Sequence, residues 1–197
     1  MTKSQLILGI IISLSIFYTI IENAHVSTYI YMIIIASNLI FSICRKNINA
    51  YHICILLLTI NTLGYLLFGL GAIEPLLMEG NKVANGLIFY GLQLALNILM
   101  FFAFIFRVQI SRLFSNSKEI YLNDFDGLFH WVFLYFSLIS ALALIEFILR
   151  LVFNLNFLKI LYDNYENLVY VGWSVTTGLL FTMQLVFNKM KKQHSHR

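Results

Sequence analysis

Apolar residues are gathered into six long runs that are separated by short polar segments. The runs show no alternation with a period of two, which excludes the strands of a membrane barrel. A helix that crosses a bilayer needs about 20 mostly apolar residues. The pattern therefore predicts six transmembrane α-helices, over Leu6–Ile21, Val26–Cys44, Tyr51–Ile73, Val83–Phe106, Gly127–Phe153 and Leu168–Asn188.

Composition agrees with a membrane protein. Hydrophobic residues make up 60% of the chain and charged residues 11%, against about 45–50% and about 25% in soluble domains. A soluble fold of this length could not bury so much apolar surface. The 197 residues contain one proline, which suits long uninterrupted helices. We expect one all-α domain, an integral membrane bundle over residues 1–197.

The basic residues predict the orientation of the bundle, because Lys and Arg gather in cytoplasmic loops. With both ends of the bundle in the cytoplasm, ten of the thirteen basic residues lie inside. The three that do not are Lys82, Arg150 and Lys159. Glu22 follows the first run where a cleaved signal peptide would have a small residue, so this run is kept as a span. The bias toward Ile, Asn, Phe and Lys is typical of AT-rich genomes, and we expect the cytoplasmic (inner) membrane of a bacterium.

Two connections are long enough to hold structure of their own. The inner connection, Arg107–Asp126, begins with Val108–Phe114, which predicts a short amphipathic helix in the membrane interface. The outer connection, Asn154–Asn167, is a second interfacial candidate. Pro75 is expected to end the third span, because proline breaks helices.

Polar residues form stripes on three of the predicted spans. At 100° per residue, the members of each stripe share one helix face. The stripes are Cys54, Asn61, Tyr65 and Phe68; Gly86, Tyr90, Gln93 and Asn97; and Tyr170, Ser174, Thr177 and Gln184. We expect these faces to point into the bundle. They could hold helices together, at about 0.6 kcal/mol per hydrogen-bonded pair, or they could line a path for a solute.

Glu146 is the one acid well inside an apolar run, and Arg150 follows it by one helical turn. An (i, i+4) spacing lets the two side chains meet, which favours an ion pair near the outer interface. The alternative is a titrating site for protons or cations, because intramembrane charges often mark function.

Small residues at a spacing of four occur on two spans, as Ser137 with Ala141 and Gly9 with Ser13. Such pairs let helices approach closely, within one chain or between chains. Besides the lipid bilayer, the possible partners are therefore a second copy or another membrane protein. His130 lies on the same side of its span as Ser137 and is a further candidate functional residue.

Patterns for metals, cofactors and known enzymes are missing from the sequence. Cys44, His52 and Cys54 lie at similar depth, but His52 and Cys54 are two residues apart on one helix and point in nearly opposite directions. No phosphate loop, nucleophile elbow or zinc-protease motif is present. The basic residues lie in short loops, not on one soluble face, so nucleic acid is not an expected partner.

Three functional interpretations remain open, and each predicts a different structure. A non-enzymatic sensor, accessory or immunity-type protein acting through helix contacts is favoured, and it predicts separate hydrogen-bonded pairs and an exposed small-residue face. A small transporter or channel using the intramembrane amides and Glu146 predicts polar stripes that converge on one cavity. An intramembrane enzyme of unfamiliar type predicts acids or histidines that converge at a cleft.

Overall fold

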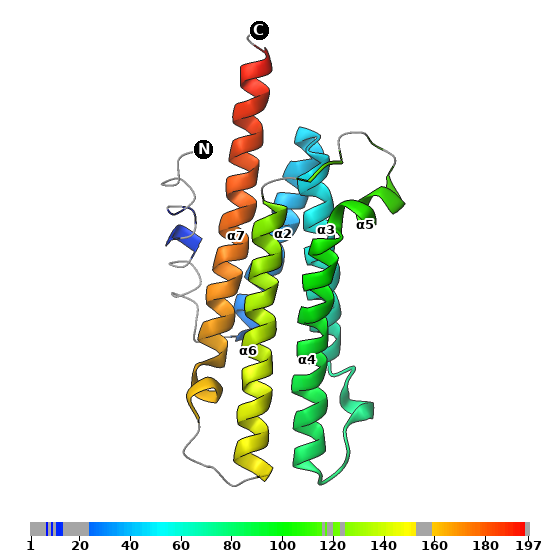
Figure 1. Cartoon of the computed structure of the whole chain (residues 1–197), viewed down its shortest axis with the longest axis vertical. Helices are drawn as coiled ribbons and strands as arrows, with labels where there is room; N and C mark the ends of the chain where they lie inside the picture. Colours follow the sequence, from blue (N-terminus) through cyan, green and yellow to red (C-terminus); the bar gives the residue numbers. More distant parts are fainter. Residues whose placement is uncertain are drawn as a thin grey trace.

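The structure is a computed structural model that describes residues 7, 9, 11–13, 24–115, 117, 120–122, 125–152 and 159–195. Five long helices run side by side along its length (Figure 1). All five are long and apolar enough to cross a membrane, and no strand occurs among the described residues. The expected class, an all-helical membrane protein, is confirmed. The predicted first span, Leu6–Ile21, lies largely outside the described residues, so the number six stays a prediction.

The long helices follow the predicted runs closely. They are α2 (Ala24–Arg45), α3 (Ile48–Gly64), α4 (Lys82–Ile105), α6 (Asp126–Val152) and α7 (Ile160–Ser195). Asparagines set two of the starts, because an N-cap side chain satisfies a backbone N–H that the first turn leaves free. Asn47 accepts from the Ala50 N–H at 3.2 Å, and Asn81 accepts from the Ala84 N–H at 3.0 Å.

Two helix ends differ from the sequence prediction. The third span ends its regular α-helix at Gly64 and continues as a π-helix, η1 (Tyr65–Gly69), before the 3₁₀ turn η2 (Glu74–Leu76) that contains Pro75. The last long helix begins at Ile160, so much of the predicted outer connection is the first part of α7. The carboxylate of Glu146 on α6 holds that start.

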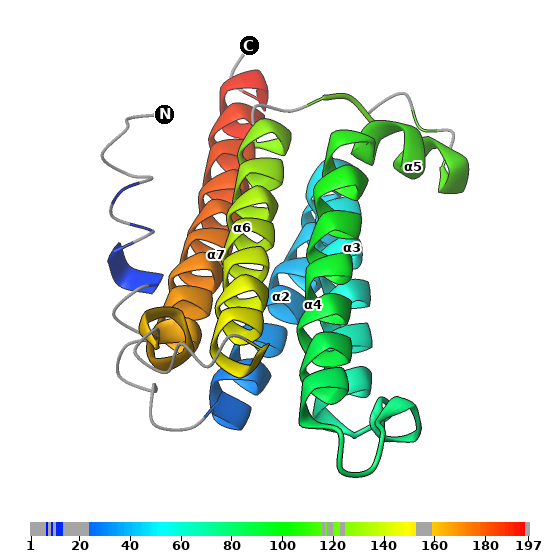
Figure 2. The same cartoon turned by 60° about the horizontal axis from the view of Figure 1, so that its bottom comes forward.

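The predicted helix after the fourth span is present as α5 (Arg107–Phe114). It turns away from the bundle (Figure 2). Leu113 and Phe114, at its far end, are each 82% exposed. Exposed apolar side chains beside the end of a span agree with a position in the membrane interface. That position of α5 stays a prediction.

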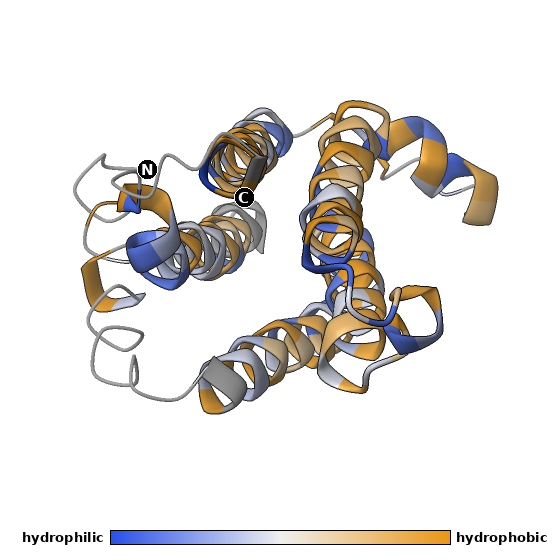
Figure 3. Ribbon diagram, turned by 90° about the horizontal axis from the view of Figure 1, so that it is seen from below, coloured by the Kyte–Doolittle hydropathy of each residue, from blue (hydrophilic) through white to orange (hydrophobic). Residues whose placement is uncertain are grey.

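The five long helices form a ring. Neighbours in the ring are α4 and α6, α6 and α7, α7 and α2, α2 and α3, and α3 and α4, and the view along the bundle shows this arrangement (Figure 3). We call the end that carries α5 the α5 end and the opposite end the η2 end. Most of the buried core, including Ile53, Phe104, Phe129 and Met183, lies in the half nearer the α5 end.

Glycines permit close helix contacts at two points of the ring. A Cβ built on Gly86 of α4 would lie 1.8 Å from the ring of Phe147 on α6. A Cβ on Gly172 of α7 would lie 2.3 Å from the ring of Phe136, also on α6. Gly86 belongs to a predicted inward-facing stripe, and this contact explains why that position is a glycine.

Gly86→Ala is therefore expected to destabilise the bundle by about 1–3 kcal/mol, because Phe147 must leave its position. Gly91→Ala is the matched control on the same helix, since a Cβ there meets no atom within 4 Å. That control should be neutral or stabilising by up to about 1 kcal/mol, from helix propensity alone. Unfolding in mixed micelles measures both. Equal effects of the two substitutions would contradict the close-packing argument.

Candidate functional site

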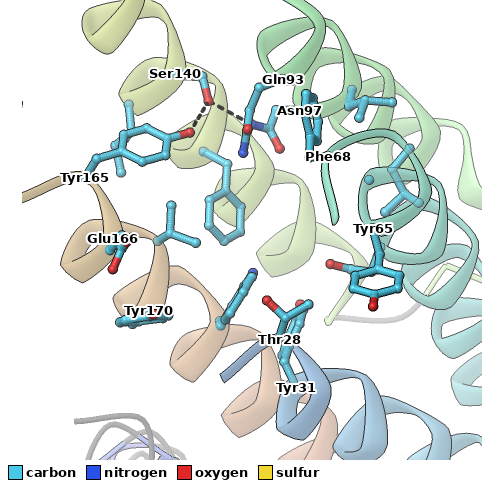
Figure 4. Close-up of a pocket in the computed structure, with 18 of the residues that line it drawn as sticks. Thr28, Tyr31, Tyr65, Phe68, Gln93, Asn97, Ser140, Tyr165, Glu166 and Tyr170 are labelled. Atoms are coloured by element: carbon cyan, nitrogen blue, oxygen red, sulfur yellow. Dashed lines mark hydrogen bonds between the residues drawn. The ribbon is translucent and has the colours of Figure 1, made fainter. Parts of the chain in front are cut away.

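A cavity of about 360 Å³ lies inside the ring, and all five long helices line it. Asn61 of α3, from a predicted stripe, lines it. Further stripe residues face it: Tyr65 and Phe68 from η1, Gln93 and Asn97 from α4, and Tyr170 from α7 (Figure 4). The inward direction predicted for Gln93 and Asn97 is confirmed, and Leu99, expected to lean outward, is 57% exposed. Six of the twelve stripe residues thus line one cavity.

One hydrogen-bonded chain crosses the cavity wall. The Asn97 side-chain nitrogen donates to the Ser140 hydroxyl at 2.9 Å, and that hydroxyl lies 3.4 Å from the Tyr165 hydroxyl. The chain joins α4, α6 and α7 (Figure 4). The stripes did not include Ser140 or Tyr165, because only the packed ring brings the three helices together.

The other two amides of the cavity are placed differently. Asn61 donates to the Leu57 carbonyl of its own helix at 2.7 Å, and it lines the cavity together with Tyr31. Gln93 lines the cavity and its side chain makes no hydrogen bond to any described residue. A polar side chain in an apolar interior loses free energy unless it finds a partner, so Gln93 is available to a bound molecule.

The cavity opens toward the η2 end. Its exposed lining residues, Gly69, Phe89 and Glu166, all lie on that side, while Tyr31 and Phe136 at its inner walls are buried. The π-helix η1 forms part of the opening, and its wider turn is seen in the Leu70 N–H that donates to the Tyr65 carbonyl at 3.0 Å. Single π-helical turns are frequent at functional sites.

Polar contacts close the α5 end between α2, α3 and α7. Gln184 on α7 donates to the Ser42 hydroxyl and to the Asn38 carbonyl, the latter at 3.4 Å. Its own side-chain oxygen accepts from the Asn47 amide at 3.4 Å. Gln184 was predicted to face inward, and its partners on the α2–α3 hairpin are a tertiary feature.

A buried arginine closes the same end on the α4–α6 side. Arg107 is fully buried, and its guanidinium lies 2.5 Å from the Asp126 carboxylate. It also donates to the Asn49 side-chain oxygen at 3.0 Å and to the Tyr121 carbonyl at 2.7 Å. In the sequence, Arg107 and Asp126 are the two ends of the predicted inner connection, and no local pattern indicates that they pair.

Glu146 and Arg150 do not form the ion pair that their spacing favours. The two Glu146 oxygens accept from the backbone N–H groups of Leu161 and Tyr162, each at 2.9 Å, and so cap the start of α7. The Arg150 guanidinium lies over the Tyr162 ring, 4.3 Å from its centroid. The ion-pair interpretation was wrong, because the free N–H groups of a helix start attract a carboxylate.

The remaining candidates lie outside the cavity. His130 packs against Phe101 and Trp131. Cys44 is exposed and Cys54 is buried. Within the described residues, no group of three or more His, Cys, Asp or Glu side chains is arranged to hold a metal ion.

The described helices and their shared cavity define the class of this chain as a helical membrane protein with a central pocket. Comparisons with protein-family models, with curated proteins and with solved structures find no match.

Proposed function

We propose that this chain is a small transporter that takes up a solute in its central cavity. The observation that carries the proposal is the meeting of the Asn61, Gln93 and Asn97 faces at one cavity of about 360 Å³. Pockets for small molecules typically measure about 300–1,000 Å³ and combine apolar walls with a few polar groups. The cavity opens at one end of the bundle and is closed at the other, as alternating access to a site requires.

The other two interpretations have less support. Action through helix contacts calls for an exposed face of small residues, but Ser137 is buried, and a Cβ on Gly9 would lie 3.4 Å from the Thr182 hydroxyl of α7. An enzyme calls for acids or histidines that converge, but His130 is outside the cavity and Glu146 caps α7. Both interpretations lack a site that the described residues build.

The proposal includes the orientation in the membrane. We place six spans in a bacterial cytoplasmic membrane with both ends of the bundle inside. The α5 end carries Arg45, Lys46, Arg107 and Arg112, and this basic end belongs in the cytoplasm. The cavity would then open to the outside.

Reporter fusions test this orientation. Fusions after Lys82 and Asn164 should report outside, because both residues lie in the first turns of long helices, α4 and α7, that begin at the η2 end. A fusion after Lys118 should report inside, because Lys118 lies in the basic connection between α5 and α6. The measurement is the activity of a reporter that works on one side of the membrane only. The opposite result at any two of the three points would overturn the proposed topology.

Binding of solutes to the purified full chain tests the function. Gly64 lines the cavity and a Cβ there meets no atom within 4 Å, so Gly64→Leu should fill the cavity without disturbing the helices. Gly91→Leu is the matched control, because Gly91 also has open space but does not line the cavity. The assay measures thermal stabilisation by a panel of small neutral, cationic and anionic solutes.

At a concentration of 100 times Kd, a bound solute should stabilise the protein by about 2.7 kcal/mol. We expect at least one solute to stabilise the wild type and Gly91→Leu but not Gly64→Leu. If no solute of any charge class distinguishes Gly64→Leu from Gly91→Leu, the proposed function is wrong.

A further inference from the structure

Aromatic rings dominate the cavity wall. Nine of its 21 lining residues are aromatic, and they come from α2, η1, α4, α6 and α7. Figure 4 shows Tyr165 and Tyr170 on one side of the cavity and Tyr65 and Phe68 on the other. A molecule in the cavity therefore meets rings on more than one side.

The rings are held by contacts with one another. Trp173 and Tyr31 stack with centroids 4.7 Å apart and planes at 9°. On the opposite wall, Phe68 and Phe89 meet edge to face with centroids 4.8 Å apart. Because each ring is fixed by a neighbour, the wall loses little conformational entropy when a ligand binds.

The charges of the cavity are of one sign. Among the described lining residues, Glu166 is the one carboxylic acid, and no Lys, Arg or His is present. The Asn97 side-chain nitrogen is already engaged by Ser140, which leaves the amide oxygen as an acceptor. Arg150 does not line the cavity, and its guanidinium lies over Tyr162. Among the described residues that line the cavity, no side chain offers a positive charge to an anion.

Ring faces carry negative potential, so a cation placed among them is attracted, most strongly by tryptophan and most strongly where water is excluded. The same ring faces would repel an anion. A neutral apolar molecule would gain only the free energy of its transfer from water. Glu166, exposed at the opening, would raise the local concentration of cations there.

We propose that the ligand of the cavity is a small organic cation, an amine or a quaternary ammonium, held between the ring walls with Glu166 at the opening. This inference rests on the proposed function, since it names the class of solute that the same cavity takes. The cavity also has room for such a molecule, because an ammonium group that carries one aromatic group or several methyl groups fits within about 360 Å³.

Three probes of nearly the same shape separate charge from size. They are choline, its neutral isostere 3,3-dimethylbutan-1-ol, and the anion 3,3-dimethylbutanoate. Binding to the full chain is measured by calorimetry in a non-ionic detergent. We expect choline to bind at least about tenfold more tightly than the alcohol, as two or more desolvated ring contacts would give. The carboxylate should show no binding.

Two variants assign the effect to the cavity. Trp173→Leu should reduce choline affinity about tenfold and leave the affinity for the alcohol nearly unchanged. Trp131→Leu is the control, because Trp131 is 62% exposed and does not line the cavity. Glu166→Gln should weaken choline about two- to fivefold, in the range of an exposed charge pair.

The outcomes separate the two proposals. If the alcohol or the carboxylate binds as tightly as choline and Gly64→Leu abolishes that binding, the cation inference is wrong and the proposed function stands. If choline binds but Gly64→Leu and Trp173→Leu leave it unchanged, the ligand lies elsewhere and the inference is wrong. If none of the three probes binds, the inference is wrong, and the wider solute panel decides on the function.

Discussion

Arg107→Met should lower the free energy of unfolding by about 3–5 kcal/mol, because breaking one half of a buried ion pair leaves the other charge in a low-dielectric site. The Arg107 side chain is 0% exposed and that of Asp126 is 2% exposed, so water cannot replace the lost guanidinium. The substitution also removes the donors to Asn49 and to the Tyr121 carbonyl. Titration with a denaturing detergent measures the change.

Arg112→Met is the matched control on the same helix. Arg112 is exposed, and within the part of the chain that the structure describes it makes one hydrogen bond, of 3.3 Å to the Ile120 carbonyl. Its loss should therefore cost less than about 1 kcal/mol. The double change Arg107→Met with Asp126→Leu should recover part of the loss, because a buried pair can often be replaced by apolar groups. Equal losses for Arg107→Met and Arg112→Met would show that the buried pair does not hold the α5 end.

Glu146→Ala is the second substitution with a large expected effect, a loss of about 2–4 kcal/mol. The carboxylate accepts from two N–H groups at the start of α7, and a hydrogen bond to a charged group is worth about 1.5–3 kcal/mol. Removing an N-cap costs about 0.5–2 kcal/mol even for a neutral side chain. Glu146→Gln keeps one acceptor and should cost about half as much as Glu146→Ala.

Arg150 separates the capping role from an ion pair. Arg150→Gln should cost less than about 1 kcal/mol, the strength of an exposed cation–π contact with Tyr162. In the cap interpretation, Glu146→Gln with Arg150→Gln is no more stable than Glu146→Gln alone. If the double variant instead recovered stability, the result would favour an ion pair between Glu146 and Arg150 over the cap. The measurement is again unfolding in mixed micelles, supported by hydrogen exchange at the Leu161 and Tyr162 amides.

The long helices could be predicted from the sequence because a lipid-facing helix must be apolar along its whole length. The predicted span Val83–Phe106 and the observed α4, Lys82–Ile105, differ by one residue at each end. The start of α7 could not be predicted in this way. Its first turns mix Ile160 and Leu161 with polar residues such as Asp163, so they show no continuous apolar run. Glu146, whose carboxylate accepts from the Leu161 N–H, lies 15 residues before Leu161 on another helix.

The candidate site was predictable in part. Helical phase alone directed Asn61, Gln93 and Asn97 inward, because polar side chains avoid lipid wherever a protein interior is available. Helical phase could not show whether those faces would pair with one another or surround a space. It also missed the contributions of Tyr31 and Ser140, which lie on α2 and α6, two helices for which no polar stripe was predicted.

The sequence by itself determined the class of the protein, its long helices and the inward faces of three of them. These features depend on the composition of each segment and on the periodicity of its polar residues. Both are properties of one segment surrounded by lipid and need no knowledge of its neighbours. Tertiary structure decided the partners: Arg107 with Asp126, Glu146 with the start of α7, and the amides with a common cavity. A hydrogen bond or ion pair forms with whichever group the packed ring brings near, and spacing along one helix does not contain that information.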